Sequence, residues 1–358
     1  MKVIFKRVGI VIFWLALIMG ILYLPEGKII PIEEKSINVF AWGDILEPSV
    51  IDEFEKTTGI KVHLNYFASN EELLVKLKAT GGKGYDLIIP SDYSVKILRE
   101  DNLLKPFDKR KLSFYSSLNP MLLDHAFDPD NLYSIPFEWE LFVLGINTNF
   151  FANRPYDPSW KMLFDPKVVN YPITMINDPV EAILFAAFYL YGPVESLNPE
   201  QFQEVVKLLI QQKKWVTAYA DFRADYFLAS KNCPVVLSST SYIFRTMRRF
   251  DFINFAVPKE GTFVTIENLC IPQASKKEHL TYKLINFLYQ PKSMKTHFET
   301  YGVFPATLDV LPDLDLNEET KALLNTSPET FKKFYFARVI TSQQALRDAW
   351  IQVKSTNE

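Results

Sequence analysis

Residues 37–67 read INVFAWGDILEPSVIDEFEKTTGIKVHLNYF, and this stretch predicts a strand, a helix and a second strand in that order. The apolar, β-rich run 37–42 stops at a Gly-Asp pair, which is typical of a buried strand that ends in a turn. Residues 48–58 follow with apolar side chains at helical spacing, and Gly59 stands where a C-terminal cap would be. Residues 60–67 then alternate as a strand does. Such a unit favours an open α/β sheet, in which ligands bind just outside the carboxyl ends of the strands.

The pattern of a strand followed by a polar turn is repeated further along the chain. Residues 71–79 predict a helix with Asn70 as its cap, and residues 85–90 predict a second buried strand. The sequence Ser-Asp-Tyr at 91–93 lies at the end of that strand, as Trp-Gly-Asp at 42–44 lies at the end of the first. Because both strand ends point the same way, the sequence predicts a pocket between them.

The second half of the chain has its own α/β alternation. The long apolar run 141–147 is a reasonable place for the chain to cross between domains, and we place the first boundary near Leu144. Residues 160–250 then alternate strand and helix patterns. Within them, Asp178 and Glu181 stand at the start of a predicted helix. These two acids are either capping residues or polar groups of a site, and the sequence leaves both interpretations open.

A later predicted strand, over residues 263–271, carries a single carboxylate, Glu267. An unpaired buried charge is costly, so a carboxylate in the interior would have a purpose. The alternative is an edge strand on which Glu267 faces water. The strand pattern alone does not choose between them.

Composition describes an ordinary soluble globular protein of two domains. The chain has 358 residues, a net charge of −3 and 48% apolar residues, so no charge field would gather nucleic acid. Cys233 and Cys270 are too few for a disulfide scaffold or a four-cysteine zinc site, and they form either one bridge or two buried thiols. The sequence contains no G-x-S-x-G, H-E-x-x-H or phosphate-loop motif, so we expect no catalysis, no cofactor and no metal.

The N-terminus predicts export from the cytoplasm. Lys2, Lys6 and Arg7 precede an uncharged apolar run at 8–24, which is the order of a secretory signal. The run exceeds a usual signal core of about 7 to 15 residues and reaches the roughly 17 to 25 residues that span a bilayer. Residues 1–36 are therefore an export signal or an uncleaved anchor in the inner membrane. Either one would leave the following domain outside the inner membrane.

Acids and aromatic side chains recur at the predicted loop positions. Ammonium groups form charge-assisted hydrogen bonds with carboxylates, and the methylenes between them lie along rings that also attract the charge. A cleft with these groups suits an organic cation. An anion site would need arginines, but Arg245, Arg248 and Arg249 cluster on a predicted helix that we interpret as a solvated face away from these loops.

Several collinear motifs resemble the periplasmic spermidine/putrescine-binding proteins of ABC transporters. They are VFAWGD at 39–44, FEKTTGIKV at 54–62, SNE at 69–71, YDLIIPSDY at 85–93, YSIP at 133–136, VPKEG at 257–261 and LINFL at 284–288. The resemblance implies a two-lobed type II periplasmic-binding fold of the α/β class, with a hinge and an interlobe cleft. It also implies a monomer that captures a polyamine and delivers it to an inner-membrane permease. We expect lobe 1 over 37–144 and about 264–310, and lobe 2 over 145–263 and about 311–358.

The same resemblance implies the ligand-binding residues. The family's cleft residues match Trp42, Asp44, Ser91, Tyr93, Asp178, Glu181 and Glu267, the last as glutamate in place of aspartate. The candidate site extends to Gly43, Asp92, Glu138, Ser238 and Thr265.

Four aromatic positions of the family are not aromatic in this chain. They fall on Ile45, on Ser238 or its neighbours, on Thr265 and near Val303. Each lost cation–π face is worth on the order of 0.5 to 2 kcal/mol, so the class of ligand is better defined than its identity. Candidates for refilling the site are Phe137, Glu138, Trp139, Tyr226 and Tyr242. Alternatives to a polyamine carrier are a binding protein of the same fold for another cationic or polar solute and an anchored sensory module.

Overall fold

The computed structural model describes residues 13–15, 35–220 and 223–356, and Ile37–Glu358 forms one compact unit. The predicted export signal or anchor therefore lies almost wholly outside the described residues. Within the described ranges, no helix combines the length and the apolar character needed to cross a membrane.

The strand, helix and strand predicted at the start of this unit are present. β1 (Ser36–Ala41), α2 (Pro48–Thr58) and β2 (Lys61–Tyr66) follow one another, and β3 (Leu87–Ile88) completes a three-stranded sheet of order β2-β1-β3. Gly59 ends α2 with φ of 69°, in the left-handed region where glycine is favoured. The predicted cap is confirmed.

The helix after β2 begins differently from the prediction. α3 (Asn70–Thr80) is capped by Ser69, whose Oγ accepts a hydrogen bond from the Glu72 backbone N–H at 3.2 Å. Asn70 is instead buried, and its Nδ2 donates to Ser91 Oγ at 3.1 Å. The prediction that Asn70 is the cap was wrong, because that side chain is used to join α3 to the end of β3.

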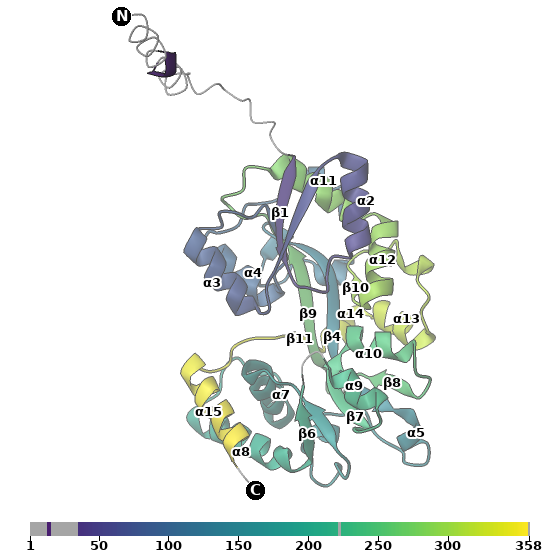
Figure 1. The fold of residues 1–358 in the computed structure, drawn as a ribbon. Coiled ribbons are helices and arrows are strands. Elements are labelled where there is room, and N and C mark those ends of the chain that lie inside the picture. The colour runs from purple at the N-terminus through teal and green to yellow at the C-terminus, as the bar shows by residue number, and fades with distance from the viewer. Residues whose placement is uncertain (1–12, 16–34, 221–222, 357–358) are drawn as a thin grey trace, which may run out of the picture. The chain divides into compact units, whose positions relative to one another are not determined.

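One long strand, β4 (Ile135–Asn147), connects the two halves of an eight-stranded sheet with the path β11-β9-β4-β7-β5-β6. Its first half pairs antiparallel with β9 (Thr262–Leu269), and its second half, from Phe142, pairs with β7 (Val235–Ser239). Figure 1 shows β4 and β9 running together between the part that carries β1 and the part that carries β7. The remaining strands are β5 (Ile173–Met175), β6 (Val216–Tyr219), β8 (Ile253–Ala256), β10 (Phe304–Pro305) and β11 (Phe334–Phe336).

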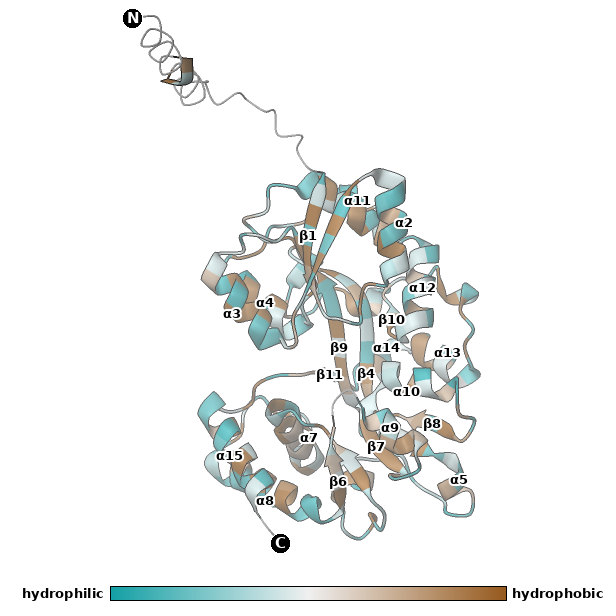
Figure 2. Cartoon of the chain, in the orientation of Figure 1, coloured by the Kyte–Doolittle hydropathy of each residue, from teal (hydrophilic) through white to brown (hydrophobic). Residues whose placement is uncertain are grey.

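Helices flank both sheets. Figure 2 shows that α7 is predominantly apolar, whereas α8 and α15 carry polar residues beside their apolar ones. The helices beyond α2 and α3 are α4 (Asp92–Glu100), α5 (Thr148–Phe151), α6 (Lys161–Phe164), α7 (Pro179–Tyr191), α8 (Pro199–Gln212), α9 (Ala224–Ala229), α10 (Thr240–Met247), α11 (Glu278–Leu288), α12 (Pro291–Tyr301), α13 (Glu318–Leu324), α14 (Pro328–Phe331) and α15 (Gln343–Ser355).

Two hydrophobic clusters form the core, one around β1, β3 and β9 and one around β5 and α7. Leu323 and Phe331, which we expected in lobe 2, pack into the first cluster. The exact limits of the lobes stay a prediction. Cys233 and Cys270 are buried and both are free thiols, so the bridge that the sequence left open is not formed.

Candidate functional site

A cavity of about 460 Å³ lies where strands of both sheets end. Every residue of the principal predicted site lines it: Trp42, Asp44, Ser91, Tyr93, Asp178, Glu181 and Glu267. Of the extended set, Ser238 and Thr265 also line it. Residues far apart in the sequence are thus brought to one cavity of a size suited to a small solute.

Glu267 on β9 is hydrogen-bonded to the residues that follow two other strands, β1 and β3, at the floor of this cavity. Its Oε2 accepts a hydrogen bond from Trp42 Nε1 at 2.9 Å, and its Oε1 accepts one from Ser91 Oγ at 2.6 Å. β9 is paired on both sides at this point, with Glu138 of β4 on one side and Ser91 on the other. The alternative that Glu267 lies on an edge strand and faces water is therefore wrong.

The surroundings of Glu267 favour its neutral form. Burial raises the pKa of the carboxyl group to about 8, with a smaller contribution from the charge of Asp92, while the hydrogen bonds from Ser91 and Trp42 oppose the shift. A cation placed against this carboxyl group would favour the charged form. A cation that binds at the floor of the cavity should therefore displace the proton of Glu267.

Three residues of the extended set, Gly43, Asp92 and Glu138, do not line the cavity. Asp92 is buried behind it, and its Oδ2 accepts a hydrogen bond from the Ile266 backbone N–H at 2.9 Å. Glu138 is buried beside Glu267 in the sheet, and burial raises its pKa well above the ordinary range. Asp92 and Glu138 are therefore buried acids next to the cavity and not part of its lining.

The far wall of the cavity comes from the N-terminus of α7. Asp178 is the N-cap, because its Oδ1 accepts a hydrogen bond from the Glu181 backbone N–H at 2.9 Å. Both side chains also line the cavity, so the capping and the site interpretations hold together for Asp178. Tyr93 lies near them and donates its hydroxyl to Glu71 Oε1 at 3.0 Å. We call Glu71, Tyr93, Asp178 and Glu181 the acidic end of the cavity.

A second group of polar side chains was not in the predicted site. Glu140 on β4 accepts a hydrogen bond from Ser241 Oγ at 2.6 Å, and the Arg245 guanidinium lies 4.5 Å from the centre of the Tyr242 ring. All four residues line the cavity, and we call them the arginine end.

The interpretation of Arg245 as part of a solvated face was wrong. Arg248 and Arg249 are exposed, but Arg245 is half-buried and lines the cavity. α10 starts directly after β7, so its first turns lie at the carboxyl end of that strand. Arg245 stands four residues after Ser241 and three after Tyr242, which places all three on one helical face. That spacing was the signal in the sequence.

Of the side chains that we expected to replace the missing aromatic walls, only some line the cavity. Tyr242 lines the cavity and Tyr301 joins it, although Tyr301 was not predicted. Phe137, Glu138 and Trp139 are buried outside the lining, and Tyr226 is 62% exposed. Three of the positions that lost an aromatic side chain, Ser238, Thr265 and Val303, do line the cavity. Their change therefore alters the cavity wall directly.

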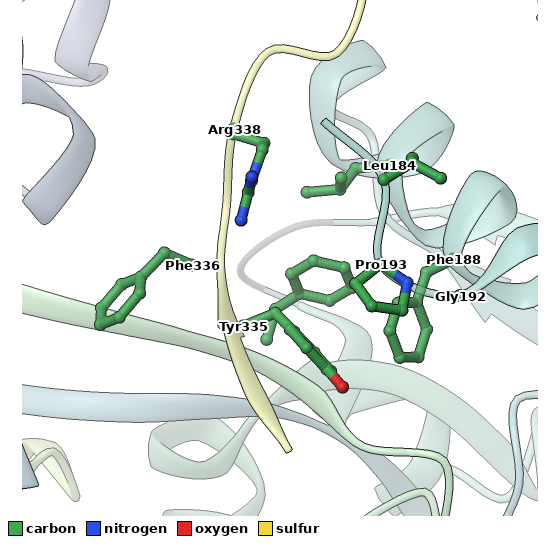
Figure 3. Close-up of a pocket in the computed structure, with 9 residues that line it drawn as sticks. Leu184, Phe188, Gly192, Pro193, Tyr335, Phe336 and Arg338 are labelled. Carbon is green, nitrogen blue, oxygen red and sulfur yellow. The ribbon is translucent and has the colours of Figure 1, made fainter. Parts of the chain in front are cut away.

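A small hollow beside β11 shares one residue with the cavity. Figure 3 shows Leu184 and Phe188 of α7 facing the segment that carries Tyr335 and Arg338. The hollow measures about 10 Å³, which is room for one water molecule and not for a solute. Arg338 lines both spaces and forms an ion pair with Glu195.

Comparisons with known proteins agree with this architecture. The sequence profile of a family described as bacterial extracellular solute-binding protein matches residues 49–323. A spermidine/putrescine-binding periplasmic protein of Salmonella typhimurium is 29% identical over 275 residues, covering 75% of this chain and 77% of that protein. A putrescine/cadaverine-binding protein of Pseudomonas aeruginosa is 26% identical over 333 residues, covering 89% of this chain and 94% of that protein.

The structural likeness extends over nearly the whole described chain. A solved structure of a candidate spermidine/putrescine ABC transporter from Listeria monocytogenes superposes with a TM-score of 0.78 at 25% identity, covering 90% of this chain and 99% of that one. The likeness confirms the two-lobed type II periplasmic-binding fold that the motifs implied.

Proposed function

The chain belongs to the family of bacterial extracellular solute-binding proteins, and from that premise we propose that it captures a di- or polyamine in the cavity and delivers it to an ABC transporter permease. Relatives named for spermidine, putrescine or cadaverine binding support the ligand class. In this proposal the protein is a periplasmic monomer that binds no nucleic acid and performs no catalysis. The segment 1–36 directs its export or holds it at the inner membrane.

The observation that carries this proposal is the set of carboxylates that face one cavity from different elements. Glu267 on β9 lies at the floor, and Asp178 and Glu181 come from the start of α7. Ammonium groups are the natural partners of such carboxylates, and the Trp42 ring offers a face to the methylenes between them. Trp42 is held by its own hydrogen bond to Glu267, so ring and carboxylate are positioned together.

The proposal is tested by calorimetric titration of the purified protein with putrescine, cadaverine and spermidine. We expect saturable binding of at least one of them. Asp178→Asn should weaken it by at least tenfold, because asparagine caps a helix as well as aspartate does but carries no charge. A matched control is Asp108→Asn, which changes an N-cap carboxylate outside the cavity lining. Flat titrations with all three amines, or an unchanged affinity in Asp178→Asn, would remove the proposal.

A further inference from the structure

The cavity carries charges of opposite sign at its two ends. The acidic end is built at the N-terminus of α7, which follows β5, whereas Arg245 lies on α10, which follows β7. β5 and β7 are neighbours in the sheet, so the two helices begin at the same edge but at different positions along it. Burial and the charges of Glu71 and Asp178 raise the pKa of Tyr93 at the acidic end. At the other end burial and the charges of Glu140 and Asp44 raise the pKa of Tyr242, whereas the charge of Arg245 lowers it.

The charge of Arg245 is available to a ligand. Within the part of the chain that the structure describes, its guanidinium makes no ion pair, whereas Arg338 is paired with Glu195. The charge of Arg245 acts on Glu140, and one oxygen of Glu140 accepts a hydrogen bond from Ser241 Oγ. Burial also raises the pKa of Glu140, which favours its neutral form beside Arg245.

The wall near this end offers a hydroxyl group with no partner. Ser238 is 2% exposed and lines the cavity, and its Oγ has no hydrogen-bond partner among the described residues. A buried hydroxyl group without a partner is uncommon unless something else completes it. Thr265, and Ser238 or one of its neighbours, stand where the family that the motifs resemble has aromatic side chains. The cavity therefore has hydroxyl groups where a cation would need ring faces.

These features fit a ligand whose two ends differ. An ammonium group placed near an uncompensated guanidinium is repelled, whereas an oxygen acceptor receives hydrogen bonds from its planar fork. Stacking on Tyr242 holds the guanidinium plane in place for that contact. At the acidic end the preference is reversed, and an ammonium group is favoured.

We propose that this cavity prefers an amine whose far end is an oxygen acceptor, a carboxylate or an amide carbonyl, over an amine with a second ammonium group there. The inference rests on the proposed function, because the ammonium group at the acidic end is shared by both. The ammonium end lies against Asp178 and Glu181. The acceptor end lies against Arg245 and the Ser238 hydroxyl.

The test is a calorimetric comparison of ligands with equal chain length: 1,4-diaminobutane, N-acetyl-1,4-diaminobutane and 4-aminobutanoate, repeated with chains one carbon shorter and one longer. We expect at least one acceptor-ended ligand to bind the wild-type protein tenfold or more tightly than the matched diamine. The amide and carboxylate arms show which acceptor is preferred. A diamine that binds more tightly than both matched acceptor-ended ligands at every length would overturn this inference and leave the proposed function standing, whereas no binding by any amine would overturn both.

Variants of Arg245 separate its role from a general effect on the fold. Arg245→Met should lower the affinity for the acceptor-ended ligand tenfold or more and raise that for the matched diamine, so that the order is reversed. Arg245→Lys keeps the positive charge but not the planar pair of N–H donors, so it should lose only part of the preference for acceptor-ended ligands. Arg249→Met, an exposed change just beyond the same helix, is the control and should leave the order unchanged. Equal losses for both ligand classes in Arg245→Met and Arg245→Lys, with unchanged thermal midpoints, would contradict the assignment.

Discussion

Glu267 couples ligand binding to the release of a proton. Its pKa of about 8 in the free protein means that the carboxyl group is largely protonated at pH 6 to 7, whereas a di- or polyamine that places one ammonium group against Glu267 requires the carboxylate. Binding should therefore release a proton, and affinity should rise with pH towards 8, by at most about tenfold per unit. Calorimetry in buffers of different ionisation enthalpy counts the protons. Glu267→Gln should abolish the release, and exposed Glu100→Gln should not; equal release in Glu267→Gln and the wild type would contradict this role.

The same shift predicts the pH dependence of the free protein. Between about 4.5 and 8 the unfolded chain has lost the proton of Glu267 while the folded protein keeps it, so the unfolded state binds fewer protons. The free energy of unfolding should therefore fall as pH rises through this window. Asp92, with a pKa raised by burial to about 7, contributes with the same sign. Thermal midpoints without ligand at pH 5 and pH 8 measure the effect, and Glu267→Gln should reduce the difference.

Trp42 tunes this proton through its indole N–H. Trp42→Phe keeps a ring but removes the 2.9 Å hydrogen bond that stabilises the charged form of Glu267. The midpoint of proton release should move to higher pH by about one unit, since a hydrogen bond to a charged group is worth roughly 1.5 to 3 kcal/mol and the neutral form recovers part of it. Trp215→Phe loses a comparable bond, to the Leu163 carbonyl, outside the cavity and should leave the midpoint in place. If the midpoint of proton release is unchanged in both variants, Trp42 contributes only its ring face to the cavity and its N–H does not affect the pKa of Glu267.

At the scale of elements, the junction between α12 and α10 fixes the arginine end. Gly302 ends α12 with φ of 75°, and a Cβ there would lie 2.7 Å from the Ser241 carbonyl oxygen and 3.2 Å from Arg245 Cγ. Gly302→Ala should cost about 2 to 4 kcal/mol, of which the backbone conformation accounts for about 1. Gly59→Ala is matched, because φ is 69° and nothing lies within 4 Å of the new Cβ; it should cost only about 1 kcal/mol.

Urea denaturation of both variants measures this difference. Gly302→Ala should also weaken ligand binding, because the contact pushes against Ser241 and Arg245 at the cavity wall. Gly59→Ala should bind as the wild type does. Equal free energies of unfolding in the two variants would show that the junction adapts and does not fix α10.

Elements whose ends are marked by local signals were predictable from the sequence. The Asp-Pro pair at 178–179 marks the start of α7 and Gly59 marks the end of α2, because capping depends on neighbouring residues only. Asn70 and Arg245 were misjudged for one shared reason. The sequence gives the helix, but whether a polar side chain turns to water or to a cavity depends on the element packed opposite. For Asn70 that element is the end of β3, and for Arg245 it is the cavity wall beyond β7.

At the scale of the whole molecule, long strands connect the region of β1 with the region of α7. β4 and β9 run through both regions, and β11 pairs with β9 before the chain continues to α15. The cavity lies across these connections, so its walls can approach when the connecting strands bend. A ligand that contacts Trp42 on one wall and Asp178 on the other favours the closed arrangement, because only that arrangement makes both contacts.

Ligand binding should therefore compact the protein. Small-angle X-ray scattering of the wild type should show a smaller radius of gyration with saturating ligand than without it. At about a hundred times its dissociation constant, the ligand should also add about 2.7 kcal/mol to the free energy of unfolding. Asp178→Asn, measured at saturation for its own weaker affinity, should compact less, because one wall has lost the charge that draws it to the ligand. Full compaction in that variant would place the driving contact on another residue of the far wall, with Glu181 the first to test.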